Sequence, residues 1–302
     1  MNLQVKIADV TFKNPIILAS GCCGFGKEYD KLYPMEALGG LSLKGLTPEE
    51  RQGNPPPRVA ETPAGMLNSV GLQNPGIDAF LERELPALAG RDVVKIANAA
   101  GATVEEYAYM ARRLDSSPID MIEANISCPN VKQGGAAFGT DCGMAAQVVA
   151  AMRKNTTKPL MVKLSPNVTD IVAIAKAAED AGADAISLIN TLLGMRIDIA
   201  TRRPVLHQNV GGLSGPAVFP IALRMVWQVA NAVKIPVVGL GGIEKWQDVI
   251  EMMMAGAQAV QIGAALFGDP FTPVKILEGM QQWMEQKGIS DVNDIIGSVQ
   301  PY

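Results

Sequence analysis

The sequence has little that would support metal or hydrolytic chemistry. It contains a single histidine, His207, among 302 residues. This excludes a zinc site with several histidine ligands, and a Ser-His-Asp triad would have to use His207. The four cysteines, at positions 22, 23, 128 and 142, form no C-x-x-C pair. The usual spacing for zinc or an iron–sulfur cluster is therefore missing, and we expect no metal site in this chain.

An excess of positive charge and a long apolar run are also missing. Lys and Arg total 26 against 30 Asp and Glu, so the net charge is −4. Because phosphate contacts need clustered basic charge, a nucleic-acid partner is not expected. The longest apolar-leaning stretch, Met252 to Gly268, contains Gln258 and Gln261 and falls short of the roughly 20 apolar residues of a membrane helix. Lys6 and Asp9 lie where a signal peptide would be apolar, so we predict a cytoplasmic protein with reduced thiols and no membrane partner.

What the chain does have is a regular alternation of short apolar runs and longer amphipathic stretches. Strands are predicted at Pro15–Ala19, Leu41–Leu43, Val93–Ala97, Met121–Ala124, Leu160–Leu164, Ala185–Ile189, Pro236–Gly239 and Ala259–Ile262. Helices are predicted at Thr103–Leu114, Asp141–Lys154 and Val168–Ala181, where apolar residues recur at helical spacing or capping residues stand at the ends. Eight strands alternating with helices favour a (β/α)8 barrel formed by residues 1–302 as one domain, although a doubly wound sheet gives a similar alternation. Leu3–Phe12 is predicted to be a strand that covers the barrel floor.

Several polar residues stand at the ends of the predicted strands, where a barrel places its active site. They are Ser20, Lys44, Asn98, Asn125, Lys163, Asn190 and Thr191. Two connections that follow strands, Gly45–Pro75 and Asn190–Pro216, are long enough to suggest a functional role. Because a buried lysine needs a partner, Lys163 either forms an internal ion pair with Glu123 or meets an anion or an electron-rich ring at the carboxyl face.

Two further patterns suggest chemistry. Glycine-rich turns at 211–215, 239–242 and 263–264 can expose backbone N–H groups at helix starts, which predicts a phosphate site late in the barrel. Cys128 stands in a segment expected to lie over the barrel mouth, where a thiol can act as a general base. We interpret Cys22, Cys23 and Cys142 as small buried apolar residues, and His207 as a surface residue.

Taken together, these motifs resemble the catalytic subunits of class 1B dihydroorotate dehydrogenases, over essentially the whole chain. The matching segments are Ala19-Ser20-Gly21, Lys44-Gly45, Asn68 to Asn74, Asn125-Ile126-Ser127-Cys128-Pro129-Asn130, Asn190-Thr191, Gly212 to Gly215 and Gly241-Gly242. Class 2 enzymes use serine as the base and carry an N-terminal extension, whereas this chain has Cys128 and begins directly at a strand.

The resemblance implies an FMN-dependent enzyme that oxidises dihydroorotate to orotate in pyrimidine synthesis. Cys128 would remove the C5 proton while a hydride leaves C6 for the flavin, and Lys163 would stabilise the reduced flavin. The implied substrate-binding residues are Lys44, Asn68, Ser69, Val70, Gly71, Leu72, Asn125, Asn190 and Thr191. The implied FMN-binding residues are Ser20, Lys44, Gly45, Asn98, Asn125, Lys163, Ile189, Gly215, Gly241, Gly242, Gly263 and Ala264.

The resemblance also implies partners: a homodimer of this chain joined by a second subunit that carries FAD and a 2Fe-2S cluster and passes electrons to NAD. One departure is Gly263-Ala264, where the family more often has Gly-Thr, so a hydroxyl near the phosphate is missing. The alternatives are a class 1A enzyme that uses fumarate, a dihydropyrimidine dehydrogenase-like flavoenzyme, and a non-enzymatic binding barrel. Dihydropyrimidine dehydrogenases typically have the sequence SCPH at the position where this chain has Ser127-Cys128-Pro129-Asn130.

Overall fold

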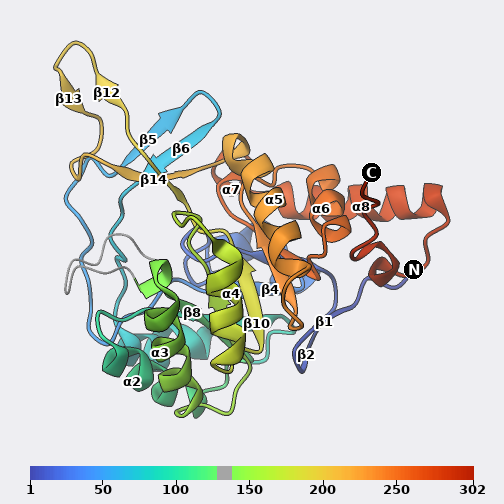
Figure 1. The fold of residues 1–302 in the computed structure, drawn as a ribbon, viewed down its shortest axis with the longest axis horizontal. Helices are drawn as coiled ribbons and strands as arrows, with labels where there is room; N and C mark the ends of the chain where they lie inside the picture. The colour runs from blue at the N-terminus through green and yellow to red at the C-terminus, as the bar shows by residue number, and fades with distance from the viewer. Residues whose placement is uncertain (128–137) are drawn as a thin grey trace.

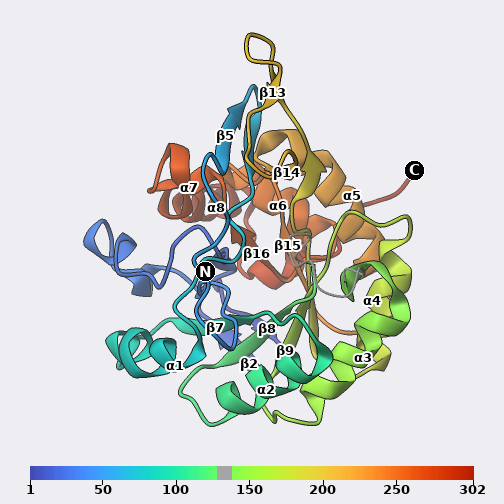
Figure 2. The same ribbon diagram turned by 90° about the vertical axis from the view of Figure 1, so that its left-hand side faces the viewer.

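The central feature of the molecule is a closed barrel of eight parallel strands. The computed structural model describes residues 1–127 and 138–302. The barrel strands follow one another in the order β10-β15-β16-β3-β4-β7-β8-β9, with helices around the outside (Figures 1 and 2). Their bounds are β3 Ile16–Leu18, β4 Gly40–Ser42, β7 Val94–Ala99, β8 Met121–Asn125, β9 Leu160–Lys163, β10 Ala185–Leu188, β15 Val237–Leu240 and β16 Ala259–Ile262. The closed sheet confirms the predicted (β/α)8 barrel and excludes the doubly wound sheet.

The eight predicted strands all occur, with ends shifted by no more than two residues. Most of them are buried along their whole length, as expected of parallel strands that are covered by helices on one side and fill the barrel on the other. Their apolar residues belong to one continuous core cluster that also includes the inner faces of the helices.

The helices begin where capping side chains satisfy their first N–H groups. Thr103, Asp141 and Asp170 each accept a hydrogen bond from the backbone N–H three residues later. The helix predicted from Val168 therefore begins at Ile171, after its cap. The α-helices are α1 Ile77–Ala79, α2 Val104–Asp115, α3 Cys142–Arg153, α4 Ile171–Asp180, α5 Phe219–Ala230, α6 Trp246–Met254, α7 Ala265–Gly268 and α8 Thr272–Lys287. Shorter helical turns lie at Tyr29–Lys31, Met35–Ala37, Phe80–Glu84, Leu85–Leu88, Phe138–Thr140, Pro216–Val218 and Val292–Ile295.

The N-terminal segment is a hairpin, so the prediction of a single strand at Leu3–Phe12 is wrong. Strands β1 (Val5–Ile7) and β2 (Val10–Phe12) pair antiparallel, and Ala8 between them has a φ of 50°. The inward-facing residues have odd numbers in β1 and even numbers in β2. A single continuous strand would keep the same alternation throughout, so this change in the apolar pattern indicates a turn. Phe12 is fully buried, and its ring lies against Gly40 at the start of β4. The hairpin thus covers the floor of the barrel, as expected.

The two long connections form a second sheet that projects from one end of the barrel (Figures 1 and 2). Strands β5 (Val59–Thr62) and β6 (Gly65–Asn68) come from the first connection, and β11 (Leu192–Gly194) and β14 (Gly211–Ser214) from the second. They pair in the order β11-β14-β6-β5. The hairpin of β12 (Ile197–Asp198) and β13 (Arg203–Pro204) lies at the tip. We call this whole projection the arm.

Within the described ranges, no helix has both the length and the apolar character that a membrane span requires.

Candidate active site

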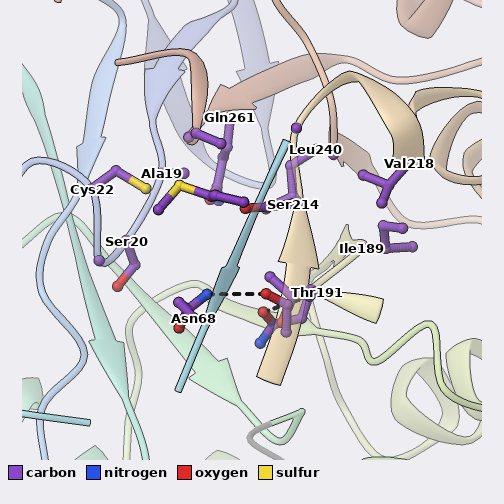
Figure 3. Close-up of a pocket in the computed structure, with 18 of the residues that line it drawn as sticks. Ala19, Ser20, Cys22, Asn68, Ile189, Thr191, Ser214, Val218, Leu240 and Gln261 are labelled. Carbon is purple, nitrogen blue, oxygen red and sulfur yellow. Dashed lines mark hydrogen bonds between the residues drawn. The ribbon is translucent and has the colours of Figure 1, made fainter. Parts of the chain in front are cut away.

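A cavity opens at the carboxyl ends of the barrel strands, between the barrel and the base of the arm. Figure 3 shows side chains on strands, such as Asn68 and Gln261, and just after strands, such as Ser20 and Ile189, arranged around this space. The predicted site residues that line it are Ser20, Lys44, Gly45, Asn68, Val70, Gly71, Leu72, Asn98, Asn125, Lys163, Ile189, Asn190, Thr191, Gly215, Gly241, Gly242, Gly263 and Ala264. Residues far apart in the sequence are therefore brought together as the barrel predicts.

Two predicted residues, Ser69 and Cys128, are not among the described residues that line the cavity. Ser69 does not line the cavity: it is fully buried, its N–H donates to the Arg58 carbonyl oxygen (2.8 Å) and its own carbonyl oxygen accepts from Asn54 Nδ2 (2.8 Å). Its Oγ is buried without a hydrogen-bond partner in the described part of the chain, and the contact of Ser69 with substrate stays a prediction. Cys128, the predicted base, lies outside the described residues.

The residue before Cys128 is held by amide side chains of the cavity wall. Ser127 Oγ donates to Asn125 Oδ1 (2.8 Å), and Asn190 Nδ2 donates to Ser127 Oγ (2.6 Å). Asn190 Oδ1 in turn accepts the N–H of Thr191 (2.8 Å). These bonds fix the orientation of two amides at the mouth, and connect them to the start of the segment that carries Cys128.

Glu123 is a fully buried carboxylate beneath this cavity. It accepts four hydrogen bonds, from Ser42 Oγ and Asn98 Nδ2 to Oε2 (both 2.7 Å) and from Ser187 Oγ (2.8 Å) and Gln261 Nε2 (2.6 Å) to Oε1. Burial would raise the pKa of this carboxyl group, but the charge of Lys163 and the hydrogen bonds hold its pKa below the usual value.

Lys163 lines the cavity and is 5% exposed. The predicted ion pair with Glu123 does not form as a direct contact: four donors already occupy the roughly four lone-pair sites of the carboxylate. The two charges attract each other over a longer distance, so the ammonium group remains available to a ligand. The ligand-facing role of Lys163 stays a prediction.

Two amides at the cavity wall have carbonyl oxygens without a partner. Asn98 and Gln261 use their N–H groups on Glu123, and Asn98 Oδ1 and Gln261 Oε1 are buried and accept no hydrogen bond within the described part of the chain. Both residues line the cavity. Gln261 was not among the predicted site residues, although its polar side chain in the middle of a buried strand was a signal that could have identified it.

The glycine turns form another part of the wall. Gly215, Gly241 and Gly242 have φ values of 104°, 124° and 76°, which favour glycine. A Cβ atom on Gly242 would lie 2.7 Å from the Phe219 N atom and 2.8 Å from the Gly215 carbonyl oxygen. The backbones of two turns are thus packed too closely for any side chain, and both face the cavity.

The remaining candidate groups follow the predictions only in part. Cys23 is buried, and burial raises its pKa to about 12. Cys22 is half-buried and lines the cavity, and burial raises its pKa although Lys163 and Lys44 oppose this. Cys142 is exposed at the start of α3, so its interpretation as a buried apolar residue is wrong. His207 is exposed, as predicted.

Among the described residues no group of three or more His, Cys, Asp or Glu side chains is arranged to hold a metal ion. The cavity combines glycine turns, a buried lysine and several amides at the carboxyl ends of a (β/α)8 barrel. In such barrels this face carries the active site, often with a phosphate-binding site in its last loops. The fold and the position of the cavity are those of a (β/α)8 barrel enzyme.

Comparison with known proteins identifies the family. The family model for dihydroorotate dehydrogenase matches residues 2–284. A protein of Thermoanaerobacter pseudethanolicus named dihydroorotate dehydrogenase B (NAD(+)), catalytic subunit, is 54% identical over 299 residues, which cover 99% of each chain. Proteins with the same name from Trichlorobacter lovleyi and Alkaliphilus metalliredigens are 54% and 51% identical over 299 residues, covering 99% of this chain and 98% and 99% of theirs. The chain belongs to the dihydroorotate dehydrogenase family.

Proposed function

We propose that this protein is the catalytic subunit of a class 1B dihydroorotate dehydrogenase, which oxidises dihydroorotate to orotate in pyrimidine biosynthesis with FMN as its cofactor. The observation that supports this most directly is that several groups line one and the same cavity. They are Lys163, the amides of Asn68, Asn98, Asn125 and Asn190, and the glycine turns. The whole chain, residues 1–302, would serve as one FMN-binding domain.

The cavity has the chemistry that FMN needs. The glycine turns at Gly215, Gly241–Gly242 and Gly263–Ala264 line the cavity, where their backbone N–H groups can bind a phosphate. The unpartnered oxygens of Asn98 and Gln261 fit the hydrogen-bond donors of a flavin. FMN would be held by these turns together with Ser20, Lys44, Gly45, Asn98, Asn125, Lys163 and Ile189. Bound there, it would accept the two electrons of the oxidation.

Amide side chains suit the substrate because each offers a donor and an acceptor to a neutral ring with alternating N–H and C=O groups. In this proposal Asn68, Asn125, Asn190 and Thr191 bind the ring, with the backbone of residues 70–72, and Lys44 pairs with the carboxylate. Asn68 Nδ2 lies 3.5 Å from the Gly212 carbonyl oxygen (dashed line in Figure 3), a long bond that a substrate could replace. Cys128 would take the C5 proton, and Lys163 would stabilise negative charge on the reduced cofactor.

The final acceptor follows from the relatives, which are named for NAD(+) and as catalytic subunits. We propose that this chain forms a homodimer and works with a second subunit carrying FAD and a 2Fe-2S cluster. In this proposal the FAD and the cluster belong to the partner subunit and not to this chain.

The test is anaerobic mixing of the purified yellow protein with dihydroorotate. We expect the visible absorption of oxidised flavin to be bleached and orotate to be formed in equal amount. The reduced protein is then offered NAD, NAD with the partner subunit, or fumarate. A protein that binds no flavin, or whose flavin dihydroorotate does not reduce, contradicts the proposal, and efficient reoxidation by fumarate alone would move the protein to class 1A.

A further inference from the structure

Glu123 is a buried charge that the proposed reaction does not use. It lies at the centre of the barrel and binds side chains from four strands: Ser42 on β4, Asn98 on β7, Ser187 on β10 and Gln261 on β16. A buried carboxylate is costly unless it is fully hydrogen-bonded, and a merely structural polar group could have been neutral. Its arrangement therefore calls for an explanation in terms of the site above it.

The four donors divide into two equivalent pairs. Each carboxylate oxygen accepts one serine hydroxyl and one amide N–H: Oε2 those of Ser42 and Asn98, and Oε1 those of Ser187 and Gln261. A hydroxyl can rotate and either donate or accept, whereas an amide must turn by 180° to exchange its N–H for its carbonyl oxygen. Because a carboxylate only accepts, it forces both amides to point their N–H groups at Glu123.

The consequence lies at the cavity wall. With their N–H groups engaged, Asn98 and Gln261 direct buried carbonyl oxygens away from Glu123, and neither oxygen has a partner in the described structure. An unsatisfied buried acceptor is expensive, so these two oxygens indicate a ligand with hydrogen-bond donors. Gly45 supports this for Asn98, because a Cβ atom at position 45 would lie 2.9 Å from Asn98 Oδ1 and cover it.

We propose that Glu123 is a positioning residue of the flavin site, which holds Asn98 and Gln261 so that both present hydrogen-bond acceptors to the cofactor. This rests on the proposed function. Gln261 lies two residues before the Gly263–Ala264 turn, so in this arrangement its Oε1 would accept from a hydroxyl group of the ribityl chain near the phosphate. Asn98 stands on β7, beside the strand β8 that carries Asn125, so its Oδ1 would accept the imide N–H of the flavin ring.

The decisive variant is Glu123→Gln, which keeps the size and shape of the side chain. A Gln side chain has one acceptor oxygen and one NH2 group, so at least one of the two amides loses its acceptor and reverses. A residue that merely fills space would be replaced adequately by Gln. We expect the variant to fold and to bind FMN at least about tenfold more weakly. This is the usual effect of losing a buried hydrogen bond when its partner is left without a replacement. FMN release on dilution, followed by flavin fluorescence, measures this without any turnover.

The matched control is Ser187→Ala, which removes one hydrogen bond from the same carboxylate but leaves both amides engaged. Its FMN affinity should stay within about threefold of the wild-type value. Equal FMN affinity of wild type and Glu123→Gln overturns the inference and leaves the proposed function intact. A wild-type chain that binds no FMN overturns the proposed function itself.

A second measurement needs no change at Glu123, in case that variant does not fold. The wild-type chain is offered FMN and N3-methyl-FMN, which lacks the imide N–H, in competition. We expect a preference of at least about tenfold for FMN, and we expect Gly45→Ala, whose methyl group covers Asn98 Oδ1, to weaken FMN binding as well. Equal binding of the two flavins by the wild-type chain overturns the role of Asn98.

Discussion

At the scale of single residues, strand alternation was the most useful predictor. It placed Lys163 and Glu123 inside the barrel, and both are buried there. It could not tell whether they touch, since this depends on which other strands supply donors. Ser42, Ser187 and Gln261 occupy the carboxylate in the structure, and none of them is close to Glu123 in the sequence.

Cys128→Ala should retain FMN but slow its reduction by dihydroorotate. Loss of a positioned base commonly costs about 10²–10⁴-fold in rate. Stopped-flow absorbance after anaerobic mixing measures the effect. Cys128→Ser should restore part of the rate at higher pH, and an unaltered rate in the alanine variant would remove Cys128 from the mechanism.

Lys163→Met should lower both the potential of the bound flavin and its rate of reduction. The variant loses a positive charge next to developing negative charge in a low-dielectric site, an effect on the order of 10²-fold in rate. The potential is measured by equilibrating the reduced protein with reference dyes. If the potential is unchanged while thermal stability falls, Lys163 serves mainly to balance the buried charge of Glu123.

The depressed pKa of Glu123 makes stability depend on pH in one direction. A carboxylate whose pKa is lower in the folded than in the unfolded chain stabilises the fold above its ordinary value of 4.5, and this contribution is lost as the pH falls through the folded-state pKa. Wild type should therefore lose more stability than Glu123→Gln between pH 6 and acidic pH, as judged by urea unfolding. The exposed Glu285→Gln provides the control, and parallel pH profiles for wild type and Glu123→Gln would contradict the prediction.

At the scale of elements, the barrel strands were predictable because burial on both sides leaves short apolar runs that recur along the chain. The arm was not predictable, although both connections that build it were recognised as long. Pairing of β6 with β14 joins residues about 145 positions apart, such as Asn68 and Gly212, and neither strand is an apolar run. Their register depends on the barrel that brings the two connections together.

Helix α4 allows the contribution of a helix N-cap to stability to be tested, because Asp170 caps its first turn. The side chain accepts the N–H of Ala173 at 3.0 Å. Asp170→Ala should lower the free energy of unfolding by about 1 kcal/mol, the usual cost of losing an N-cap. Asp170→Ser keeps a capping oxygen and should lose much less. Denaturant unfolding monitored by circular dichroism would decide, and equal stabilities of the two variants would contradict the capping role.

At the scale of the whole molecule, exposed apolar side chains gather on the arm. Val59, Leu193, Met195, Ile197, Ile199 and Val210 are each at least 45% exposed. Phe267 and Phe271 are also exposed, and Phe267 lines the cavity, so a second apolar region lies close to the proposed cofactor.

The two-subunit arrangement predicts where NAD reduction occurs. The purified chain should reduce NAD very slowly or not at all with dihydroorotate, and addition of the FAD and iron–sulfur subunit should restore the activity. Absorbance of NADH at a fixed concentration of this chain, with increasing amounts of partner, gives the stoichiometry. Rapid NAD reduction by this chain alone would refute the arrangement.

The pairing of β6 with β14 also restricts how this protein can change during evolution. One ladder connects Asn68, proposed to bind substrate, with β14, whose last residue Ser214 directly precedes Gly215, proposed to bind phosphate. An insertion or deletion inside β6 or β14 would shift the register and displace both groups at once. The β12–β13 tip lies beyond this ladder, so its length and sequence can vary without moving the site. Homologous enzymes should therefore keep a constant spacing between these two strands and the barrel, while insertions accumulate at the tip.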